Sequence, residues 1–482
     1  MAQKIFKRCF TSRRSSDDEA MQLTDSSSVE TNDNTLNNEN SSHGRYTKRE
    51  LILLACCLSS SFSSNVVLGL PAPFLPHLNE YHNIQSDITG WVMGLMPLIQ
   101  MPMSLVYGKL MAYIAVKSML VGGVLSLGVS TVAFGMLEYY PLPPDDASIQ
   151  PGFLIIEILL RIIHACGSAA VIVSGLTLLT TTFPHNTATV MGYASTAMGV
   201  GFMCGPAIGS GFFAIGGFSV TFAAMGAMLI IQSFVILCTA QAPESVGREE
   251  GDKPSVIKLL KNKTIFIDIL LMTLVGVLWV SIEPILEPEI RNKFGLPDEI
   301  SALIFLLVSL TYTLSSPLVG KAIDAVSWVT PWWMMAFGFV LHAVNFCFMG
   351  PMPLLVLLGF HRPLWLLIVT LAIMGIALAF GFVSGMNLII PTEFEDENNE
   401  ELKKNTKAMC VGFVTFAYSL GSFTGLTLSG VIAAYGSFGI TMSCFAIACS
   451  VPATLIISTL TIKYVRNRNK ANQEETQPLH SN

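Results

Sequence analysis

Charged side chains are scarce in this chain. Asp, Glu, Lys and Arg make up 12% of its 482 residues, against about 25% in an average soluble domain. Apolar residues make up 52%. Because a surface that faces water needs many more charges than this, the composition excludes an ordinary soluble fold and indicates a chain that lies mostly in lipid.

The sequence also lacks the signatures of several other protein classes. It has no basic block of the kind that binds nucleic acid, so we expect no nucleic-acid partner. Its ten cysteines show no metal-ligand spacing and predict neither a metal site nor a disulfide framework. It has no phosphate-binding glycine loop, nucleophile elbow or zinc-protease helix. We therefore expect no enzyme, no ATP-driven pump and no cofactor.

Apolar runs of about 20 residues, the length that crosses ~30 Å of hydrocarbon, recur along the chain. Polar breaks separate twelve of them. This predicts an all-α membrane protein with twelve transmembrane helices in two six-helix bundles. The runs lie approximately at 50–76, 88–108, 117–137, 152–173, 189–214, 218–240, 264–288, 299–321, 329–350, 363–391, 406–434 and 436–465.

Polar segments divide the chain into five parts. Residues 1–48 and 466–482 are too polar to bury a core, so we expect flexible tails. No short apolar core with a small-residue cleavage site precedes the first run, so we expect no removable signal peptide. A linker at 243–263 separates an N-terminal bundle, 49–242, from a C-terminal bundle, 264–465.

Lys and Arg are concentrated on one side of the predicted membrane. If the N-terminus is cytoplasmic, the tails and the loops after even-numbered runs carry 23 of the 27 basic residues. The other four are Arg161, Arg291, Lys293 and Arg362. Because basic loops stay in the cytosol, we expect both termini there. The glycosylation sequons at Asn40 and Asn262 then also lie in the cytosol and stay unmodified.

The two halves repeat short patterns at offsets of about 212 to 220 residues. Leu105–Lys109 ends the second run, and Leu318–Lys321 ends the eighth. Gly201, Gly205 and Gly209 in the fifth run have counterparts at Gly421, Gly425 and Gly430 in the eleventh. This shared offset is typical of two parallel six-helix halves with a substrate site between them.

The fifth run carries Gly201, Gly205, Pro206 and Gly209. Small residues every four positions let another helix approach closely, and Pro206 removes a backbone hydrogen bond. The pattern is compatible with a hinge and equally with ordinary close packing.

Charged residues lie within the apolar runs, among them Glu157, Arg161 and Glu283. A charge at bilayer depth costs roughly 2.5 to 3.5 kcal/mol. The retention of three such charges favours a transport site.

Glu157, Arg161 and His164 lie on one face of the fourth run, where Glu157 and Arg161 can pair along the helix. One interpretation is a structural ion pair, since buried charges need partners. The other is that Arg161 holds or releases a carboxylate as a proton moves, with His164 titrating nearby. For His164 alone, a structural role is the stronger interpretation.

Glu283 has no cation within its own run, and Pro284 and Pro288 break the helix beside it. A low dielectric favours the protonated carboxyl, so this group can exchange a proton for a cation. For Glu287, one turn further along, the mouth of a pathway and plain solvent exposure are equally good interpretations. Trp279, Tyr312 and Tyr418 offer aromatic faces to an ammonium, although each alone is more typical of packing.

These motifs resemble the major facilitator superfamily, in which the glycine and proline pattern of the fifth span is typical of exporters. Within it the chain is most similar to the vesicular amine and polyamine transporters, especially the polyamine branch. The resemblance covers nearly the whole membrane portion and raises Tyr312 as a site residue. The segments that carry it are Leu160–Ser168, Pro184–Gly192, Gly205–Gly209, Ile282–Leu286, Phe294–Pro297, Thr311–Gly320 and Ile389–Thr392.

The chain departs from that family at several acids. Where monoamine and acetylcholine carriers have aspartates, it has Ser64, Met386 and Thr415. Asn65 and Asn387 stand beside two of these positions, and we include them as candidate binding residues. Gly108 is followed by Ala112 instead of the usual aspartate, whereas Gly320 keeps Asp324. These departures disfavour monoamine transport and favour the polyamine branch.

The resemblance implies a proton-coupled antiporter that moves organic cations, polyamines above all, from the cytosol into acidic secretory or synaptic vesicles by alternating access. Its partners are then protons, a small cation and the lipid bilayer. Glu283 binds proton or amine, Arg161 tunes it, Tyr312 and Asn387 line the cavity, and the helix at Gly205 and Pro206 hinges. The alternatives are a drug or amine exporter of the plasma membrane, a vesicular monoamine-type carrier, and a non-transporting receptor or scaffold.

Overall fold

The computed structural model describes residues 46–71, 74–84, 86–141, 150–240, 256–296, 298–326, 329–350, 362–388 and 400–476. Its contacts separate Met1–Lys48 from Arg49–Asn482. Of the first unit only residues 46–48 are described, so the sequon at Asn40 lies outside the described residues. The second unit contains all the features below.

Helices make up the described part of the first half of the chain. These segments are rich in Val, Ile, Leu and Ala, which suit a lipid environment. Because lipid offers no hydrogen-bond partners, the backbone N–H and C=O groups bond to each other within each helix. They are α3 (Lys48–Gly69), α4 (Leu75–Tyr81), α5 (Ser86–Leu110), α6 (Val116–Gly135), the short 3-10 helix η1 (Met136–Tyr139), α7 (Pro151–Thr182) and α8 (Thr187–Thr239).

The second half is helical in the same way. Its first full span begins at a cap in which the Asn262 side chain accepts hydrogen bonds from the backbone N–H groups of Thr264 and Ile265. The helices are α9 (Val256–Lys261), α10 (Lys263–Val280), α11 (Glu283–Phe294), α12 (Asp298–Ala325), α13 (Pro331–Met349), α15 (Leu364–Leu388), α16 (Glu400–Tyr435) and α17 (Phe438–Thr476).

Ten helices of the described chain are long and apolar enough to cross a membrane. One of them, α8, holds two crossings, because its backbone leaves helical geometry at Gly216 and Gly217. Gly217 has a φ of 71°, which favours glycine. The proline-containing α5 lies between α7 and α16 and supplies a further crossing. The twelve-span, all-α fold that the sequence predicts is thereby confirmed.

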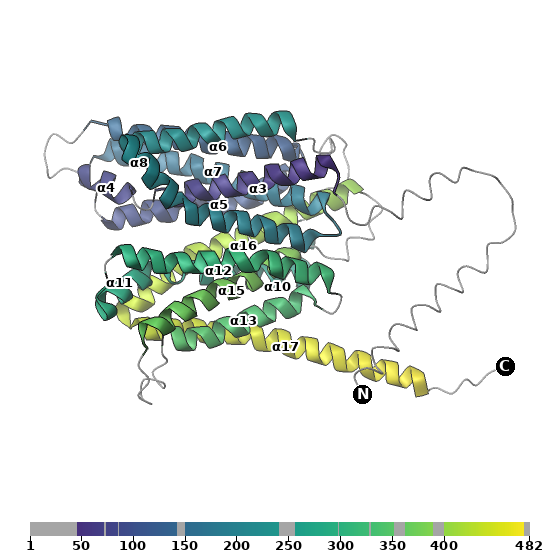
Figure 1. Ribbon diagram of the computed structural model, residues 1–482. Helices are drawn as coiled ribbons and strands as arrows, with labels where there is room; N and C mark the ends of the chain where they lie inside the picture. Colours follow the sequence, from purple (N-terminus) through teal and green to yellow (C-terminus); the bar gives the residue numbers. More distant parts are fainter. Residues whose placement is uncertain are drawn as a thin grey trace, which may run out of the picture. The chain divides into compact units, whose positions relative to one another are not determined.

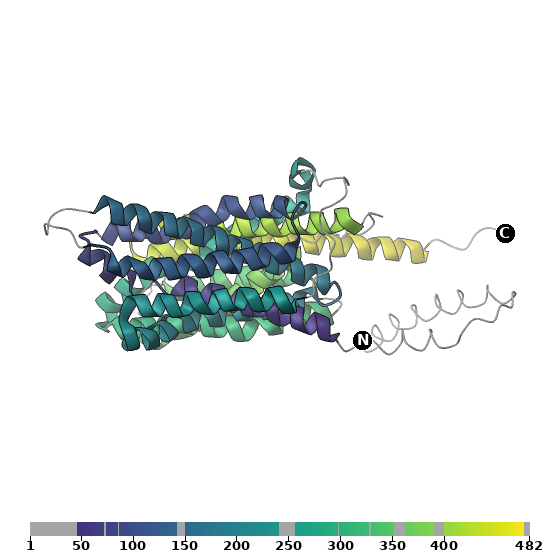
Figure 2. The ribbon, with the colours of Figure 1, turned by 90° about the horizontal axis from the view of Figure 1, so that it is seen from above.

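The crossings form two groups, as Figure 1 shows, and the view from above in Figure 2 shows the same long helices running side by side. In the first group α6 packs on α7 and α8, and α5 packs on α7. In the second, α10 packs on α16 and α15, while α13 packs on α15 and α17. The groups meet where α8 contacts α12 and where α5 contacts α16.

The C-terminal tail differs from the expectation of a flexible segment. Helix α17 continues from the membrane-crossing part, Phe438–Arg466, to Thr476. Forming the first turn of a helix is the unfavourable step. Because the membrane-crossing part is already helical, the residues that follow it can extend the helix without forming a new first turn. Residues 477–482 lie outside the described part of the chain.

The glycine repeat marks matching contacts in the two halves. Extra Cβ atoms at Gly201 and Gly205 would collide with the backbone oxygens of α3, whose helix lies directly against them. Gly421 and Gly425 stand in the same way against the backbone of α10. The third pair does not match, because Gly430 has open space where Gly209 meets side chains.

The side on which α3 begins and α17 ends is called the tail side here, and the opposite one the far side. On the tail side the halves are in close contact. An added Cβ at Gly320 of α12 would collide with the carbonyl oxygen of Ala188 of α8, and one at Gly412 of α16 would lie 2.8 Å from the carbonyl oxygen of Ser104 of α5. The halves therefore leave no passage along these two helix pairs on the tail side.

On the far side α5 and α16 are further apart. An apolar cavity of about 180 Å³ lies between α5, α7 and α16. Its lining includes Trp91 and Leu95 of α5, Ile158 of α7 and Phe423 of α16. The same helix pair is thus tight at one end and spaced at the other.

Candidate functional site

Glu283 lies at a break in the seventh crossing. Helix α10 ends at Val280, and Glu283 is the first residue of α11, with Pro284 beside it. Proline suits the first turn of a helix and cannot continue a preceding one, which explains the break. The Glu283 side chain is half-buried. The carboxylate therefore lies partly within the protein, at the point where the helix is interrupted.

Aromatic side chains from four helices gather beside this break. The ring of Trp279, one turn before Glu283 on α10, meets the ring of Tyr312 on α12 edge to face at 4.7 Å between centroids. Phe382 of α15 and Tyr418 of α16 meet in the same way at 5.3 Å. Trp279 also reaches Tyr418 at 6.4 Å. We call Trp279, Tyr312, Phe382 and Tyr418 the aromatic cluster.

Glu283 follows Trp279 by four residues at the far-side end of α10, so we treat the carboxylate and the aromatic cluster as one candidate site. A carboxylate attracts a cation, and aromatic faces add cation–π attraction of about 0.5–2 kcal/mol. Trp279 and Tyr418 are half-buried, whereas Tyr312 is 1% exposed. The arrangement suits an organic ammonium better than an anion or a neutral sugar.

Tyr312 connects this site to the other half, because its ring lies against α8 at Gly199. Gly199 leaves the room for this ring, since an added Cβ there would lie 3.0 Å from it. Tyr312 therefore lies between the tail-side contact of α8 with α12 and the aromatic cluster.

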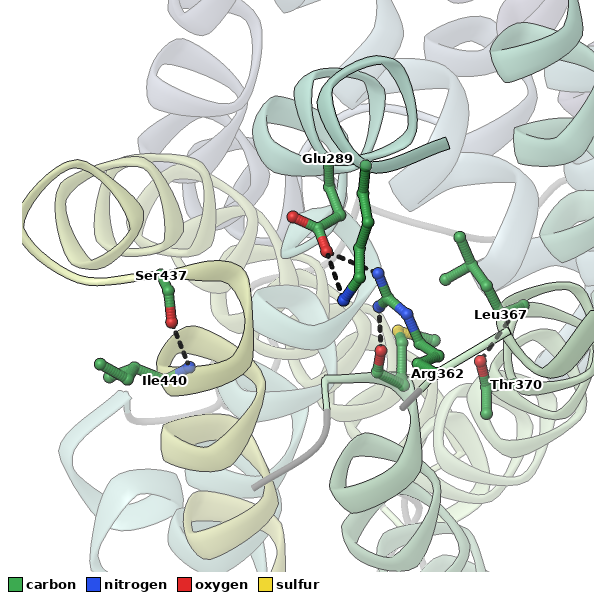
Figure 3. A network of polar contacts seen from close by, with 8 residues as sticks. Glu289, Arg362, Leu367, Thr370, Ser437 and Ile440 are labelled. Atoms are coloured by element: carbon green, nitrogen blue, oxygen red, sulfur yellow. Dashed lines mark hydrogen bonds and ion pairs between the residues drawn. The ribbon is translucent and has the colours of Figure 1, made fainter. Parts of the chain in front are cut away.

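A polar network on the far side holds α11, the helix that Glu283 begins. As Figure 3 shows, the buried guanidinium of Arg362 points to Glu289 of α11, with Nη2 and Oε1 2.5 Å apart. Arg362 also donates to the Met349 carbonyl and lies over the ring of Phe438 at 4.9 Å. Burial lowers the pKa of Arg362, and the charge of Glu289 opposes that shift. The network ties α11 to α13 and α17.

The charges of the fourth crossing form a separate group in the first half. Glu157 is fully buried and accepts a hydrogen bond of 3.3 Å from the Asn79 amide on α4. Arg161 donates to the Met93 sulfur at 3.5 Å and lies over the Phe134 ring at 4.9 Å. The expected ion pair between Glu157 and Arg161 is not formed within 4.0 Å among the described residues, because α4, α5 and α6 supply other partners.

A small cavity of about 10 Å³ lies beside Arg161 and His164. Nε of Arg161 and Nε2 of His164 are both buried without a hydrogen-bond partner in the described structure. A cavity of this size is at the lower limit for one water molecule. No ion pair or hydrogen bond joins Arg161 to Glu283 among the described residues, and the tuning of Glu283 by Arg161 stays a prediction.

The remaining predicted site residues lie apart from the aromatic cluster or have local bonds. The amides of Asn65 and Asn387 each donate to the carbonyl four residues earlier on their own helices. Glu287 is exposed and pairs with Arg291 at 3.5 Å, which favours the solvent-exposed interpretation. Helical geometry continues through Pro206, and the break in α8 lies at Gly216 and Gly217 instead. Close packing therefore describes Gly201, Gly205 and Gly209 better than a hinge.

Two fully buried polar residues, Asn79 and Asp268, were missed from the sequence. Asn79, the partner of Glu157, gave no signal, because it lies in a polar stretch between runs. Asp268 is fully buried in α10, and both of its oxygens lack a hydrogen-bond partner among the described residues. It interrupts an apolar run as Glu283 does, so the same search could have found it.

Comparisons with known proteins agree with this fold. A family model described as Major Facilitator Superfamily matches residues 57–398. The chain is 28% identical over 392 residues to the MFS-type transporter SLC18B1 of Rattus norvegicus, covering 80% of this chain and 82% of the relative. The Homo sapiens protein of that name is 28% identical over 394 residues, which cover 81% of this chain and 82% of the relative.

Among solved structures, the proton:xylose symporter XylE bound to 6-bromo-6-deoxy-D-glucose is similar with a TM-score of 0.63. The two share 13% identity over 85% of this chain and 95% of that one, so the likeness concerns the fold. The family match spans more than half of the sequence and agrees with the helical crossings found here. The chain therefore belongs to the major facilitator superfamily and is a multi-pass membrane transporter.

Proposed function

We propose that this transporter is a proton-coupled antiporter that moves organic cations, polyamines in particular, from the cytosol into acidic vesicles. The observation that carries the proposal is Glu283 at the break between α10 and α11, beside the aromatic cluster. A single carboxylate that holds either a proton or an ammonium couples the two movements in opposite directions.

The substrate class follows from the chemistry of this site. The carboxylate attracts the positive charge of an ammonium. The faces of the aromatic rings add cation–π attraction, which offsets part of the free-energy cost of removing water from the ammonium. A polyamine carries several ammonium groups on a flexible apolar chain, so one end can bind at Glu283 while methylene groups lie against Trp279 and Tyr418. The resemblance to the polyamine branch supports the same class.

The interface between the halves is tightly packed on the tail side and more open on the far side, as expected for one state of an alternating-access transporter. In this conformation the tail side is closed by the contacts of α8 with α12 and of α5 with α16. Glu283 lies beyond that closure, so we infer that it communicates with the far side. Because basic residues concentrate on the tail side, we take the tail side as cytosol and the far side as vesicle lumen.

Transport by purified protein in liposomes tests the proposal. With an acidic interior, we expect the wild type to accumulate labelled spermidine and Glu283→Gln to lose at least nine-tenths of that uptake. Glu80→Gln, which neutralises an exposed carboxylate on α4, should keep it. Undiminished gradient-driven uptake by Glu283→Gln would refute the assigned role.

A drug or amine exporter of the plasma membrane uses the same chemistry in another membrane. Fluorescently tagged full-length protein in the vesicle fraction supports the vesicular proposal, and residence at the cell surface supports the exporter. Substrate-dependent thermal stabilisation without any transport would instead support a receptor.

A further inference from the structure

The apolar cavity between α5, α7 and α16 has no part in the proposed cation site. Its volume is about 180 Å³, and its lining includes Trp91, Leu95, Ile158 and Phe423. No side chain of that lining is charged, and the indole N–H of Trp91 is the only polar group that these side chains carry. Cavities of about 150 Å³ with apolar walls stay free of water and bind apolar molecules.

Gly94 of α5 leaves part of this cavity open. It belongs to the lining, and an added Cβ there would have no surrounding atom of the described structure within 4 Å. At Gly108 of the same helix, an added Cβ would lie 3.3 Å from the Cα of Gly412 of α16. The glycine near the tail side therefore permits close packing of the two helices, whereas Gly94 borders empty space that another molecule can fill.

Exposed apolar side chains border the cavity on all three helices. Trp91 of α5 is 68% exposed, and Leu159 of α7, next to Ile158 of the lining, is 53% exposed. On α16, Leu428 lies five residues after Phe423 and is 47% exposed. In a chain that crosses a membrane, exposed apolar side chains of this kind contact lipid. The border of the cavity therefore suits acyl chains better than water.

The length of the cavity along α5 matches one leaflet of the bilayer. The lining residues of this helix extend from Ile88 to Leu98, which is roughly 15 Å at 1.5 Å per residue. That is about half of the ~30 Å of hydrocarbon in a bilayer. Trp91 lies near the far-side end, as is typical of the membrane interface. An organic cation fits this cavity less well, because it would lose water without meeting a carboxylate.

We propose that this cavity binds the acyl chain of a membrane lipid from the far-side leaflet, and that the bound chain keeps α5 and α16 apart at their far-side ends. At their tail-side ends the same helices are held together at Gly108 and Gly412. If the far side closes when the tail side opens, α5 and α16 must approach each other where the chain lies. The bound chain therefore stabilises the tail-side-closed conformation. This effect on conformation rests on the alternating access proposed above, whereas the binding does not.

Photolabelling of the purified full-length protein tests the binding. The protein is placed in nanodiscs of phosphatidylcholine that carries a diazirine on its acyl chain, and mass spectrometry locates the adducts after illumination. We expect adducts within residues 88–98 and at Phe423, and their loss in Gly94→Leu, whose side chain fills the cavity. Gly122→Leu adds the same side chain in open space on α6 and should keep the adducts. Leu98→Phe also fills the cavity and serves if Gly94→Leu does not fold.

Labelling of Leu455 on α17, which is 61% exposed, measures contact with the surrounding lipid and should be equal in all variants. Absence of adducts within residues 88–98 and at Phe423 would overturn the proposal. Adducts that persist in the cavity-filling variant would show contact with the protein surface alone and would also overturn it. Loss of the adducts when spermidine is added would assign the cavity to the transported cation instead.

The accessibility of Ala408→Cys tests the effect on conformation. Ala408 is 2% exposed and lies against Gly108, so its alkylation, with the native cysteines replaced by Ser, reports opening of the tail side. A ligand at about ten times its Kd that binds only the closed state lowers the open population about tenfold. Adding phosphatidylcholine to delipidated protein should therefore slow alkylation in the parent and in Gly122→Leu, but not in Gly94→Leu.

An equal response to phosphatidylcholine in Gly94→Leu would overturn the effect on conformation. Failure of the wild type to accumulate spermidine would instead overturn the proposed function, and the photolabelling result would still decide whether the cavity binds lipid.

Discussion

The carboxylate of Asp324 accepts a hydrogen bond of 2.6 Å from the backbone N–H of Thr189, so a residue of the second half caps a helix of the first. The bond crosses the interface that must part if the tail side opens. It also joins a negative charge to the positive end of a helix. Its strength therefore contributes directly to the stability of the tail-side-closed conformation.

Replacing Asp324 by Ala should make the tail side open more often. Losing a helix cap of this kind costs about 1–2 kcal/mol, which raises the open fraction roughly 5- to 30-fold. The measurement is the alkylation rate of Ala408→Cys, a position that is 2% exposed and lies against Gly108 of α5, with the native cysteines replaced by Ser.

The matched control for Asp324 is Glu138→Ala. Glu138 caps the second part of α8 by accepting from the Ser219 N–H at 2.7 Å, but on the far side. This variant should leave the alkylation of Ala408→Cys unchanged. Equal rates for Asp324→Ala and the parent protein would show that the cap does not hold the tail side closed.

The glycine contacts predict a graded effect of single methyl groups. Gly201→Ala and Gly421→Ala each place a Cβ against a backbone oxygen of the neighbouring helix, and such overpacking costs about 1–3 kcal/mol. Gly430→Ala adds the same methyl group in open space. We expect a lowered Tm of the purified protein for the first two variants and no loss for the third, and an equal Tm for all three would contradict the packing described here.

The aromatic cluster should contribute to cation affinity. Trp279→Leu keeps an apolar side chain but removes the ring, which costs about 0.5–2 kcal/mol of cation–π attraction and weakens spermidine binding roughly 2- to 30-fold. Trp365→Leu removes a ring that is 64% exposed on α15 and should leave affinity unchanged. Calorimetric titration measures both, and wild-type affinity in Trp279→Leu would remove that ring from the site.

The Arg362 network should contribute strongly to stability. Arg362 is buried and bonded to Glu289, and removing one partner of a buried pair costs about 3–5 kcal/mol. Glu289→Gln should therefore lower the Tm by several degrees, and Arg362→Met, which leaves the less buried Glu289, should lower it less. Lys293→Ala removes an exposed partner 3.8 Å from Glu289 and should cost under about 1 kcal/mol. A Tm lowered equally by Lys293→Ala would contradict this ranking.

The features of this fold that depend on local composition could be predicted from the sequence. Apolar runs of membrane-spanning length predicted the twelve crossings. The charge within the seventh run made Glu283 a candidate, and its site role stays a prediction. The offset between Gly205 and Gly425 predicted matching helices, because close packing needs small residues at the same place in each half. Each of these features can be recognised in a single segment of the sequence, or by comparing two segments that carry the same residue pattern.

The partners of buried groups could not be predicted, since they come from helices far apart in the sequence. The spacing of Glu157 and Arg161 predicted a pair on one helix, but Asn79 is bonded to the glutamate instead. The cluster of Trp279, Tyr312 and Tyr418 likewise needs three helices to be placed together. Sequence spacing gives the face of a helix, whereas the tertiary fold decides what that face meets.

The two tail-side contacts between halves are of unequal strength. Along α8 and α12 the close approach at Gly320 is reinforced by the carboxylate of Asp324. In the contact of α5 with α16, the position that corresponds to Asp324 is Ala112. The van der Waals contact at Gly108 is therefore not reinforced by a carboxylate. We expect separation to begin along α5 and α16, with α8 and α12 acting as the pivot, so that the first water to enter comes from the edge nearest Ala408.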